Sequence, residues 1–258
     1  MTFPRPNGEK PLLSLRKVSY RYHTPQSEIE ALREISFDVY PGEFLVLLGP
    51  SGCGKTTILS LIAGLITPSE GEIIRGSPEG SSLRIGYMFQ HDQLFPWLTV
   101  LDNALLSPRI RKEPIRGKRA AAEKLLEEYG LGAFLNSYPR ELSGGMRQRA
   151  ALIRTLNADP DLLLLDEPFS ALDYQTRITV SDDIAAIIRH EGKTAVMVTH
   201  DVSEALSLAD RMLTLTRRPS EVRNVFTVDI PETGALARRA SPRFGELYQA
   251  VWKEMTDG

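Results

Sequence analysis

The chain contains little cysteine and no long apolar run. Cys53 is the single cysteine among 258 residues, which excludes an intramolecular disulfide. No apolar stretch reaches the roughly 18 residues that a membrane-spanning helix needs, and the first residues lack the apolar centre of a secretory signal. We therefore expect the chain to stay in the cytoplasm unless a partner holds it at a membrane.

A strong excess of one charge is also missing. Lys and Arg number 31 against 33 Asp and Glu, a net charge of −2, so we expect no nucleic-acid partner. We interpret the local cluster of Arg238, Arg239 and Arg243 as a solvated face, with a basic binding patch as the alternative. Hydrophobic residues at 42% and charged residues at 25% fit a globular protein.

Continuous apolar runs predict a buried parallel sheet. The runs at 44–48, 162–165 and 194–198 are short and alternate with helical patterns. Strands that helices cover on both faces have this composition.

Alternating apolar and polar residues predict half-buried antiparallel strands at 12–20 and 35–39, on either side of a loop at 23–30. Two more short strands are expected at 71–75 and 83–89. A turn at 76–82, rich in Gly, Ser and Pro, should separate them.

Helical patterning replaces strand patterning from Leu98 to about Asn157, with one helix predicted at 118–129. The preceding stretch, 107–118, contains prolines, a glycine and several basic residues, and is predicted to be a loop between helices. The predicted organisation is an α/β core interrupted by a helical insertion.

The most informative segment is the glycine-rich turn that follows the apolar run 44–48. It reads Gly49, Pro50, Ser51, Gly52, Cys53, Gly54, Lys55, Thr56 and Thr57. A strand, such a turn and a helix place backbone N–H groups around an anion, and this pattern predicts a nucleoside triphosphate site. Lys55 should reach the β- and γ-phosphates, and the Thr56 hydroxyl should ligate Mg²⁺. The helix should run to about Ala63, and Cys53 is interpreted as a small spacer.

Polar residues follow three other predicted strands. Asp166 is positioned to hold Mg²⁺, and Glu167 to polarise an attacking water, with a solvated strand end as the alternative. His200 and Gln90 follow strands in the same way. Because a lone histidine is more often a structural hydrogen bonder, His200 alone decides nothing.

A second anion site is predicted at 142–149. Ser143 is a strong N-cap, and the glycines after it leave the first helical N–H groups uncovered. The helix then carries Met146, Ala150 and Ile153 on one face. Two phosphate sites in one chain predict a head-to-tail pair, in which each nucleotide lies between two copies.

These residues together resemble the nucleotide-binding subunit of an ATP-binding cassette (ABC) transporter, over nearly the whole chain. Six motifs occur in the family's order and approximate spacing: Walker A at 49–57, the Q-loop Gln90, the signature at 142–146, Walker B at 162–167, the D-loop at 170–173 and the switch His200. Tyr22 stands where the family places an aromatic residue that stacks on adenine, and Tyr20 is the competing choice. The signature departs at Met146, where many members have Gln.

The resemblance implies an ATP- and Mg²⁺-dependent ATPase. The implied fold is α/β, a P-loop NTPase (RecA-like) core with an antiparallel β subdomain and an inserted helical subdomain. The core with its β subdomain would span 1–94 and 158–258, and the helical subdomain 95–157. Gln90 would assist catalysis with Glu167 and His200, and would hold the metal with Thr56 and Asp166.

The implied assembly is an ATP-dependent homodimer that drives transmembrane permease subunits. Ser143 and Gly145 would contact phosphate, and Asp173 would couple the two sites across the dimer. The protein would lie peripherally on the cytoplasmic side of the cell membrane.

The stretch 90–103 resembles importers of the nitrate, sulfonate and taurine type, which share a Pro-Trp-Leu-Thr-Val-x-Asp-Asn phrase. The cargo would then be a small anion, delivered by an extracytoplasmic binding protein. The alternatives are a thiamine- or riboflavin-precursor importer, an exporter, or a soluble cassette ATPase of DNA repair or translation. The apolar residues 95–98 could receive a permease helix or pack beneath the helical insertion.

The end of the chain predicts an amphipathic helix. From Arg243 to Met255, apolar residues recur at spacings of three and four. We expect this helix to dock on its own core, with a dimer or permease contact as the alternative.

Overall fold

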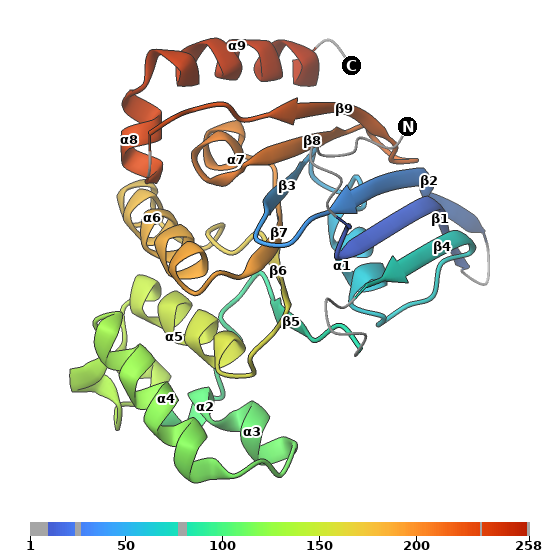
Figure 1. The fold of residues 1–258 in the computed structure, drawn as a ribbon. Helices are drawn as coiled ribbons and strands as arrows, with labels where there is room; N and C mark the ends of the chain where they lie inside the picture. The colour runs from blue at the N-terminus through green and yellow to red at the C-terminus, as the bar shows by residue number, and fades with distance from the viewer. Residues whose placement is uncertain (1–9, 24–26, 77–81, 233, 257–258) are drawn as a thin grey trace.

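A six-stranded sheet lies at the centre of the computed structural model, which describes residues 10–23, 27–76, 82–232 and 234–256 (Figure 1). The strand order is β5-β6-β7-β3-β8-β9, and every neighbouring pair is parallel except β8 and β9. The strands are β3 (Phe44–Leu48), β5 (Ile85–Met88), β6 (Leu162–Asp166), β7 (Thr194–Thr199), β8 (Arg211–Leu215) and β9 (Val222–Thr227). The predicted parallel core is confirmed.

Strand β3 shows why the apolar runs are continuous. Leu45 and Leu47 belong to one hydrophobic cluster, while Phe44, Val46 and Leu48 belong to another on the opposite face of the sheet. Because both faces of the sheet are buried, successive residues of the strand are all apolar and do not alternate with polar ones.

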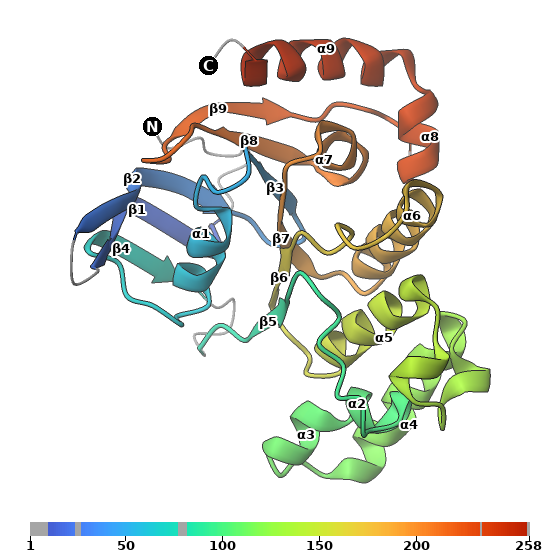
Figure 2. The same ribbon diagram turned by 180° about the vertical axis from the view of Figure 1, so that it is seen from behind.

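A three-stranded antiparallel sheet packs beside this core, with strand order β2-β1-β4. Its strands are β1 (Leu13–His23), β2 (Glu28–Val39) and β4 (Glu70–Arg75). Helix α1 (Lys55–Ile62) lies between the two sheets (Figure 2) and buries apolar side chains against both.

The predicted loop at 23–30 is too long, because β1 continues to His23 and β2 begins at Glu28. Register shifts in the β1–β2 pair, together with positive φ at Lys17 and Glu34, interrupt the alternation that would have revealed these strand ends. Most of the predicted turn at 76–82 lies outside the described residues.

Helices form the lower end of the molecule in Figure 1. They are α2 (Val100–Ala104), α3 (Leu106–Ile110), α4 (Ile115–Glu128) and α5 (Gly144–Leu156), with short 3-10 turns at Gly132–Phe134 and Pro139–Glu141. The predicted loop at 107–118 is too long, because α3 and the start of α4 occupy most of it and only 111–114 connects the two helices. Pro108 lies in the first turn of α3, where its missing N–H costs no helical hydrogen bond.

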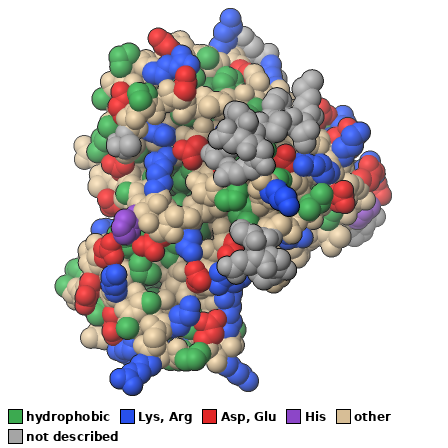
Figure 3. Space-filling view, viewed as in Figure 1, with side chains coloured by type: hydrophobic (Ala, Val, Ile, Leu, Met, Phe, Trp, Pro, Cys, Tyr) green, Lys and Arg blue, Asp and Glu red, His purple; other side chains and the backbone are tan. Residues whose placement is uncertain are grey.

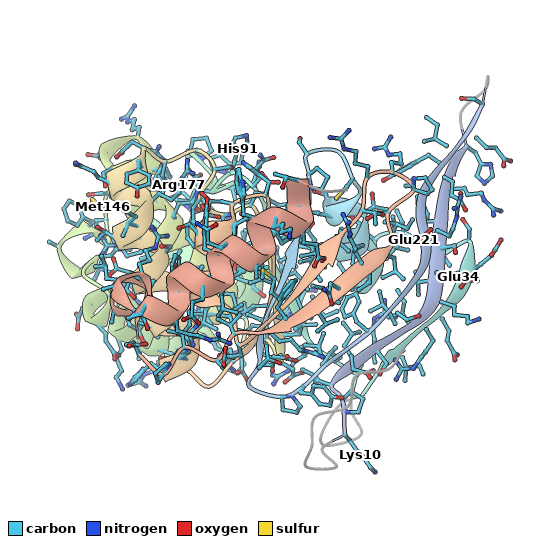
Figure 4. All side chains as sticks on the ribbon, turned by 90° about the horizontal axis from the view of Figure 1, so that it is seen from above. Lys10, Glu34, His91, Met146, Arg177 and Glu221 are labelled. Carbon is cyan, nitrogen blue, oxygen red and sulfur yellow. The ribbon has the colours of Figure 1, made fainter. Side chains whose placement is uncertain are left out.

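The remaining helices pack on the face of the sheet opposite α1. They are α6 (Tyr174–His190), α7 (Val202–Leu208), α8 (Ala235–Ala240) and α9 (Pro242–Thr256). Helix α9 crosses above β8 and β9 (Figure 4), and Phe244, Leu247 and Val251 are buried in the core. The Glu254 carboxylate accepts hydrogen bonds from Thr214 (2.6 Å) and Asn224 (2.8 Å). The C-terminal helix therefore docks on its own chain, as predicted.

The arginine cluster does not form one face: the prediction of a solvated face holds for Arg243, which lies among exposed carboxylates, and is wrong for the buried Arg238. Arg238 is only 7% exposed and donates to the Ala209 carbonyl at 2.7 Å, and burial lowers its pKa. Arg239 donates to the Ser207 hydroxyl, and Arg243 pairs with Asp229 and Glu246. On the face shown in Figure 3, the visible acidic and basic side chains are interspersed.

Within the described ranges, none of the helices combines the length and the apolar character that crossing a bilayer requires.

Candidate functional site

Neighbouring side chains pack closely against the glycine-rich turn that lies between β3 and the start of α1. A Cβ placed on Gly49 would lie 2.9 Å from Cys53 Sγ, and one on Gly54 would lie 2.8 Å from Leu32 Cδ2. Gly54 also has a φ of 113°, which disfavours other residues. The conformation of this loop therefore depends on glycine at both positions.

Cys53 fills space beneath the loop. It is 2% exposed, and burial raises the pKa of its thiol, so the neutral form is favoured. Its position agrees with a spacer and not with a nucleophile.

Lys55 connects the loop to the end of β6. Its side chain is 5% exposed, and its ammonium donates to the Gly49 carbonyl at 2.9 Å and the Pro50 carbonyl at 3.0 Å. The same Nζ lies 3.4 Å from Glu167 Oε1, and Glu167 Oε2 lies 3.1 Å from His200 Nδ1. Groups from three strand ends, predicted separately, thus form one chain of contacts.

Thr56 and Asp166 also meet, as their predicted roles require. The Thr56 hydroxyl donates to Asp166 Oδ1 at 3.1 Å, and the Tyr87 hydroxyl donates to Asp166 Oδ2 at 3.2 Å. Burial raises the pKa of Asp166 and, more strongly, that of Tyr87. Tyr87 was not predicted as a site residue, although a hydroxyl in an apolar strand three residues before Gln90 was a usable signal.

Gln90 lies apart from that pair. Its side-chain nitrogen is 3.4 Å from the Ser170 hydroxyl, which itself donates to the Glu167 carbonyl at 3.0 Å. Among the described residues, Gln90 makes no hydrogen bond to Thr56 or Asp166. The predicted trio of metal ligands is therefore only partly assembled.

Tyr22 lies beside the start of α1. Its hydroxyl is 2.9 Å from Thr57 Oγ1, and its ring is 39% exposed. Tyr20 packs edge-to-face against Tyr22, with ring centroids 4.9 Å apart, and contacts the core cluster. Of the two candidates, Tyr22 offers the free ring surface.

The signature and D-loop residues serve the fold within their own chain. Ser143 caps α5 by accepting from the Met146 N–H at 3.3 Å, and Asp173 caps α6 by accepting from the Thr176 N–H at 3.1 Å. The hydrogen bonds from Thr176 lower the pKa of Asp173. A Cβ on Gly145 would lie 2.7 Å from Val180 Cγ2, so glycine lets α5 approach α6 closely.

Comparison with known proteins decides the family. The ABC transporter family model matches residues 32–170. The chain belongs to the ABC transporter ATP-binding family. An uncharacterised ABC transporter ATP-binding protein of Bacillus subtilis (strain 168), YtlC, is 45% identical over 94% of this chain and 95% of that protein. The taurine import ATP-binding protein TauB of Jannaschia sp. (strain CCS1) is 36% identical over 93% of this chain and 92% of that protein.

Solved structures agree with this assignment. A dimeric bacterial ABC transporter cassette is 32% identical with a TM-score of 0.70, covering 84% of this chain and 98% of that one. The same coverage and identity, with a TM-score of 0.69, are found for a dimeric post-hydrolysis cassette bound to ADP and Pi. The protein is an ABC ATPase, and its ATP hydrolysis is coupled to transport.

Two arginines of this ABC ATPase tie α5 to the segment after Gln90. Arg147 donates to Asp92 Oδ2 at 3.0 Å, and Arg154 donates to the Gln93 carbonyl at 2.6 Å and the Asp92 carbonyl at 3.0 Å. Burial lowers the pKa of Arg154. The signature helix and the Q-loop are thus connected within the ABC ATPase, and no sequence pattern predicted this contact.

Asn103 shapes the turn at 95–99. It is fully buried, accepts from the Phe95 N–H at 2.8 Å, and donates to the carbonyls of Phe95, Leu98 and Thr99. The turn leaves Trp97 69% exposed and Phe95 36% exposed, with their rings 5.1 Å apart. These rings do not pack beneath the helical insertion, which removes that alternative.

Proposed function

We propose that this ABC ATPase energises the import of a small anion, namely nitrate, an aliphatic sulfonate or taurine, through a separate membrane permease. The observation that carries the proposal is the turn at 95–99, close in sequence to Gln90. Asn103 holds this turn by hydrogen bonds in a conformation that leaves Trp97 exposed. An exposed aromatic pair of this kind fits a protein partner. The taurine-import relatives support the choice of cargo.

The nucleotide would bind between the glycine-rich loop and Tyr22. The N–H groups of residues 49–57 and the Lys55 ammonium would hold the phosphates, and the exposed Tyr22 ring would stack on adenine. The Tyr22 hydroxyl already contacts Thr57, which is part of this loop.

Thr56 and Asp166 fit a magnesium ion, because a hydroxyl and a carboxylate oxygen already converge to 3.1 Å. The bound metal would neutralise charge on the phosphates. Tyr87 would hold the Asp166 carboxylate in place from its other oxygen. Gln90 would join the metal site by leaving Ser170.

Glu167 would activate water for attack on the γ-phosphate. Its carboxylate now contacts both Lys55 and His200. When Lys55 turns to the phosphates, Glu167 is released to accept a proton from water, and His200 remains to orient it and to steady the γ-phosphate.

The working unit would be a head-to-tail homodimer. Ser143 and Gly145 of one copy would cover the nucleotide on the other, and Asp173 would connect the two sites. The dimeric cassettes that resemble this chain support this arrangement. Residues 95–157 would act as a helical subdomain on a core of 1–94 and 158–258. The dimer would lie peripherally on the cytoplasmic side of the membrane, with an extracytoplasmic binding protein delivering the cargo.

Growth after deletion of the gene tests the cargo. We expect the deletion strain to lose growth on taurine, on alkanesulfonates or on nitrate at low concentration, and the wild-type gene to restore it. A strain complemented with Glu167→Gln should not grow. Normal uptake of all three anions, with loss of thiamine- or riboflavin-precursor uptake, would favour the alternative importer. Failure to co-purify with any multi-span membrane protein would contradict a transport role.

A further inference from the structure

The turn between β8 and β9, residues 216–221, contacts the phosphate loop from one side. Strand β8 lies next to β3 and parallel to it, so the carboxyl ends of both strands meet at the same edge of the sheet. From this turn the exposed Arg218 side chain donates a hydrogen bond from Nη2 to the Gly52 carbonyl at 2.8 Å.

Gly52 forms the exposed tip of the loop. It has a φ of 74°, and a Cβ placed on it would meet no described atom within 4 Å. Gly49 and Gly54, in contrast, are enclosed by Cys53, Leu215 and Leu32. Side-chain packing therefore fixes both ends of the loop, whereas the tip is tethered by Arg218.

The turn is itself anchored on β2. The Ser220 N–H donates to the Ala31 carbonyl, and the Arg33 N–H donates to the Ser220 carbonyl, both at 2.9 Å. Figure 4 shows Glu221, at the end of the turn, on the side of the molecule where β2 carries Glu34. Between the two anchoring residues, Leu32 packs on Gly54. The contacts close a ring from Gly52 through the turn and β2 back to the loop.

We propose that Arg218 is a positioning residue that holds the tip of the phosphate loop in its nucleotide-accepting conformation. In a planar trans peptide, the C=O of one residue and the N–H of the next point in opposite directions. When Arg218 holds the Gly52 carbonyl, it therefore also sets the direction of the Cys53 N–H. That N–H now donates to the Pro50 carbonyl at 3.3 Å, within the loop. The ring also joins the loop to the sheet that carries Tyr22. This inference rests on the proposed nucleotide site.

A positioning role predicts equal losses for di- and triphosphates, because the loop itself would be less ordered before either ligand binds. In Arg218→Ala we expect the Kd values for ADP and for a non-hydrolysable ATP analogue both to rise about fivefold to tenfold, the effect of one exposed charge-assisted hydrogen bond. At saturating ATP, kcat should stay within about twofold, since the interaction acts before the transition state.

The matched controls are Arg217→Ala, the neighbouring exposed arginine in the same turn, and Arg218→Lys, which keeps a cationic donor. The Kd values of both variants should stay within about twofold of wild type, which corresponds to a change of under about 0.5 kcal/mol in binding free energy. Hydrogen exchange of the amides at 51–55 in the nucleotide-free protein should be faster in Arg218→Ala alone.

Unchanged Kd values and unchanged exchange in Arg218→Ala would overturn the proposal. A loss confined to the ATP analogue would also overturn it, because it would indicate direct contact with the γ-phosphate. If Arg218→Ala does not fold, Arg218→Gln is measured against the same expectations. Lys55→Ala, measured in parallel, tests the site itself: normal nucleotide binding by that variant would refute the nucleotide site whatever Arg218 does.

Discussion

Lys55 and Glu167 neutralise each other in the structure, with 3.4 Å between the ammonium and the carboxylate. Lys55 is 5% exposed, so an unpaired charge here would be costly. An arriving phosphate would exchange one anionic partner of Lys55 for another. The lysine is therefore already desolvated before nucleotide binds, and in the proposed mechanism Glu167 would become available only when phosphate is present.

The first prediction is that Glu167→Gln traps nucleotide. The amide keeps the shape of the side chain but cannot accept a proton from water, so turnover should fall by about 100-fold or more. Without the opposing negative charge, ATP should bind at least as tightly as before. Light scattering should show a dimer in saturating ATP. Glu72→Gln, on exposed β4, is the control and should hydrolyse normally. A monomer under saturating ATP would refute the sandwich arrangement.

A second prediction concerns Glu204, which is 4% exposed and accepts from the Thr199 hydroxyl at 2.6 Å. Burial raises its pKa in the folded state, so ionisation destabilises the fold at neutral pH. Gln keeps an acceptor for Thr199. Glu204→Gln should therefore raise the free energy of unfolding by about 1 kcal/mol at pH 8, a Tm increase of about 2–4 °C.

The sign of the pH dependence follows from the direction of the shift. The folded protein holds the Glu204 proton more tightly than the unfolded chain does, so the wild type loses stability as pH rises above the unfolded pKa of about 4.3. The gain in free energy of unfolding from Glu204→Gln should reach its maximum above the pKa that Glu204 has in the folded state. It should vanish below about pH 4. Thermal unfolding between pH 4 and 8 measures it; an advantage that grows towards low pH would contradict the assignment.

Helices α5 and α6 meet at Gly145, where packing and the proposed phosphate contact coincide. In Gly145→Ala the new methyl would lie 2.7 Å from Val180 Cγ2, and we expect a loss of about 1–3 kcal/mol from overpacking. In a Val180→Ala background the same change should cost at least about 1 kcal/mol less. Denaturant unfolding of the four proteins gives this coupling.

ATPase activity then separates the two roles. If Gly145 also faces a nucleotide across the dimer, the double variant should recover stability but not hydrolysis. Full recovery of activity in the double variant would show that Gly145 acts through packing alone.

Sequence patterns predicted the elements whose signals are local. Residue type alone predicts the run 44–48 and the glycine-rich turn after it. Burial on both faces restricts the strand to apolar residues, and the tight turn requires glycine. The pattern failed at 107–118, where Pro108 can begin a helix as well as end one. It failed at Arg238 because burial of a guanidinium depends on backbone carbonyls that only the fold brings near.

The missed site contacts have the same origin. Arg147 and Asp92 lie 55 positions apart in sequence, and Tyr87 and Asp166 lie 79 apart. Residue types and spacing cannot report such pairs. The sequence predicted the N-cap at Ser143 but not the one at Asp173, which was assigned only a role across the dimer, and capping and ligand binding use the same side-chain oxygens.

At the scale of the whole molecule, the exposed turn at 95–99 predicts where the permease docks. Truncating an aromatic residue at the centre of an interface costs about 2 kcal/mol or more. Trp97→Ala should therefore reduce co-purification of the permease by at least about tenfold, while the isolated subunit hydrolyses ATP normally. Trp252→Ala is the matched control, because this second exposed tryptophan lies on α9. Equal loss in both variants would contradict the assigned surface.

The placement of the tryptophans has an optical consequence. The chain contains two, and both lie on the surface, Trp97 at 69% and Trp252 at 53% exposure. Replacing Trp252 with Phe leaves a single indole emitter, located in the turn at 95–99. Indole fluorescence moves to shorter wavelengths when water is removed from the ring. The protein can thus report, without any attached label, the moment at which a partner covers that turn.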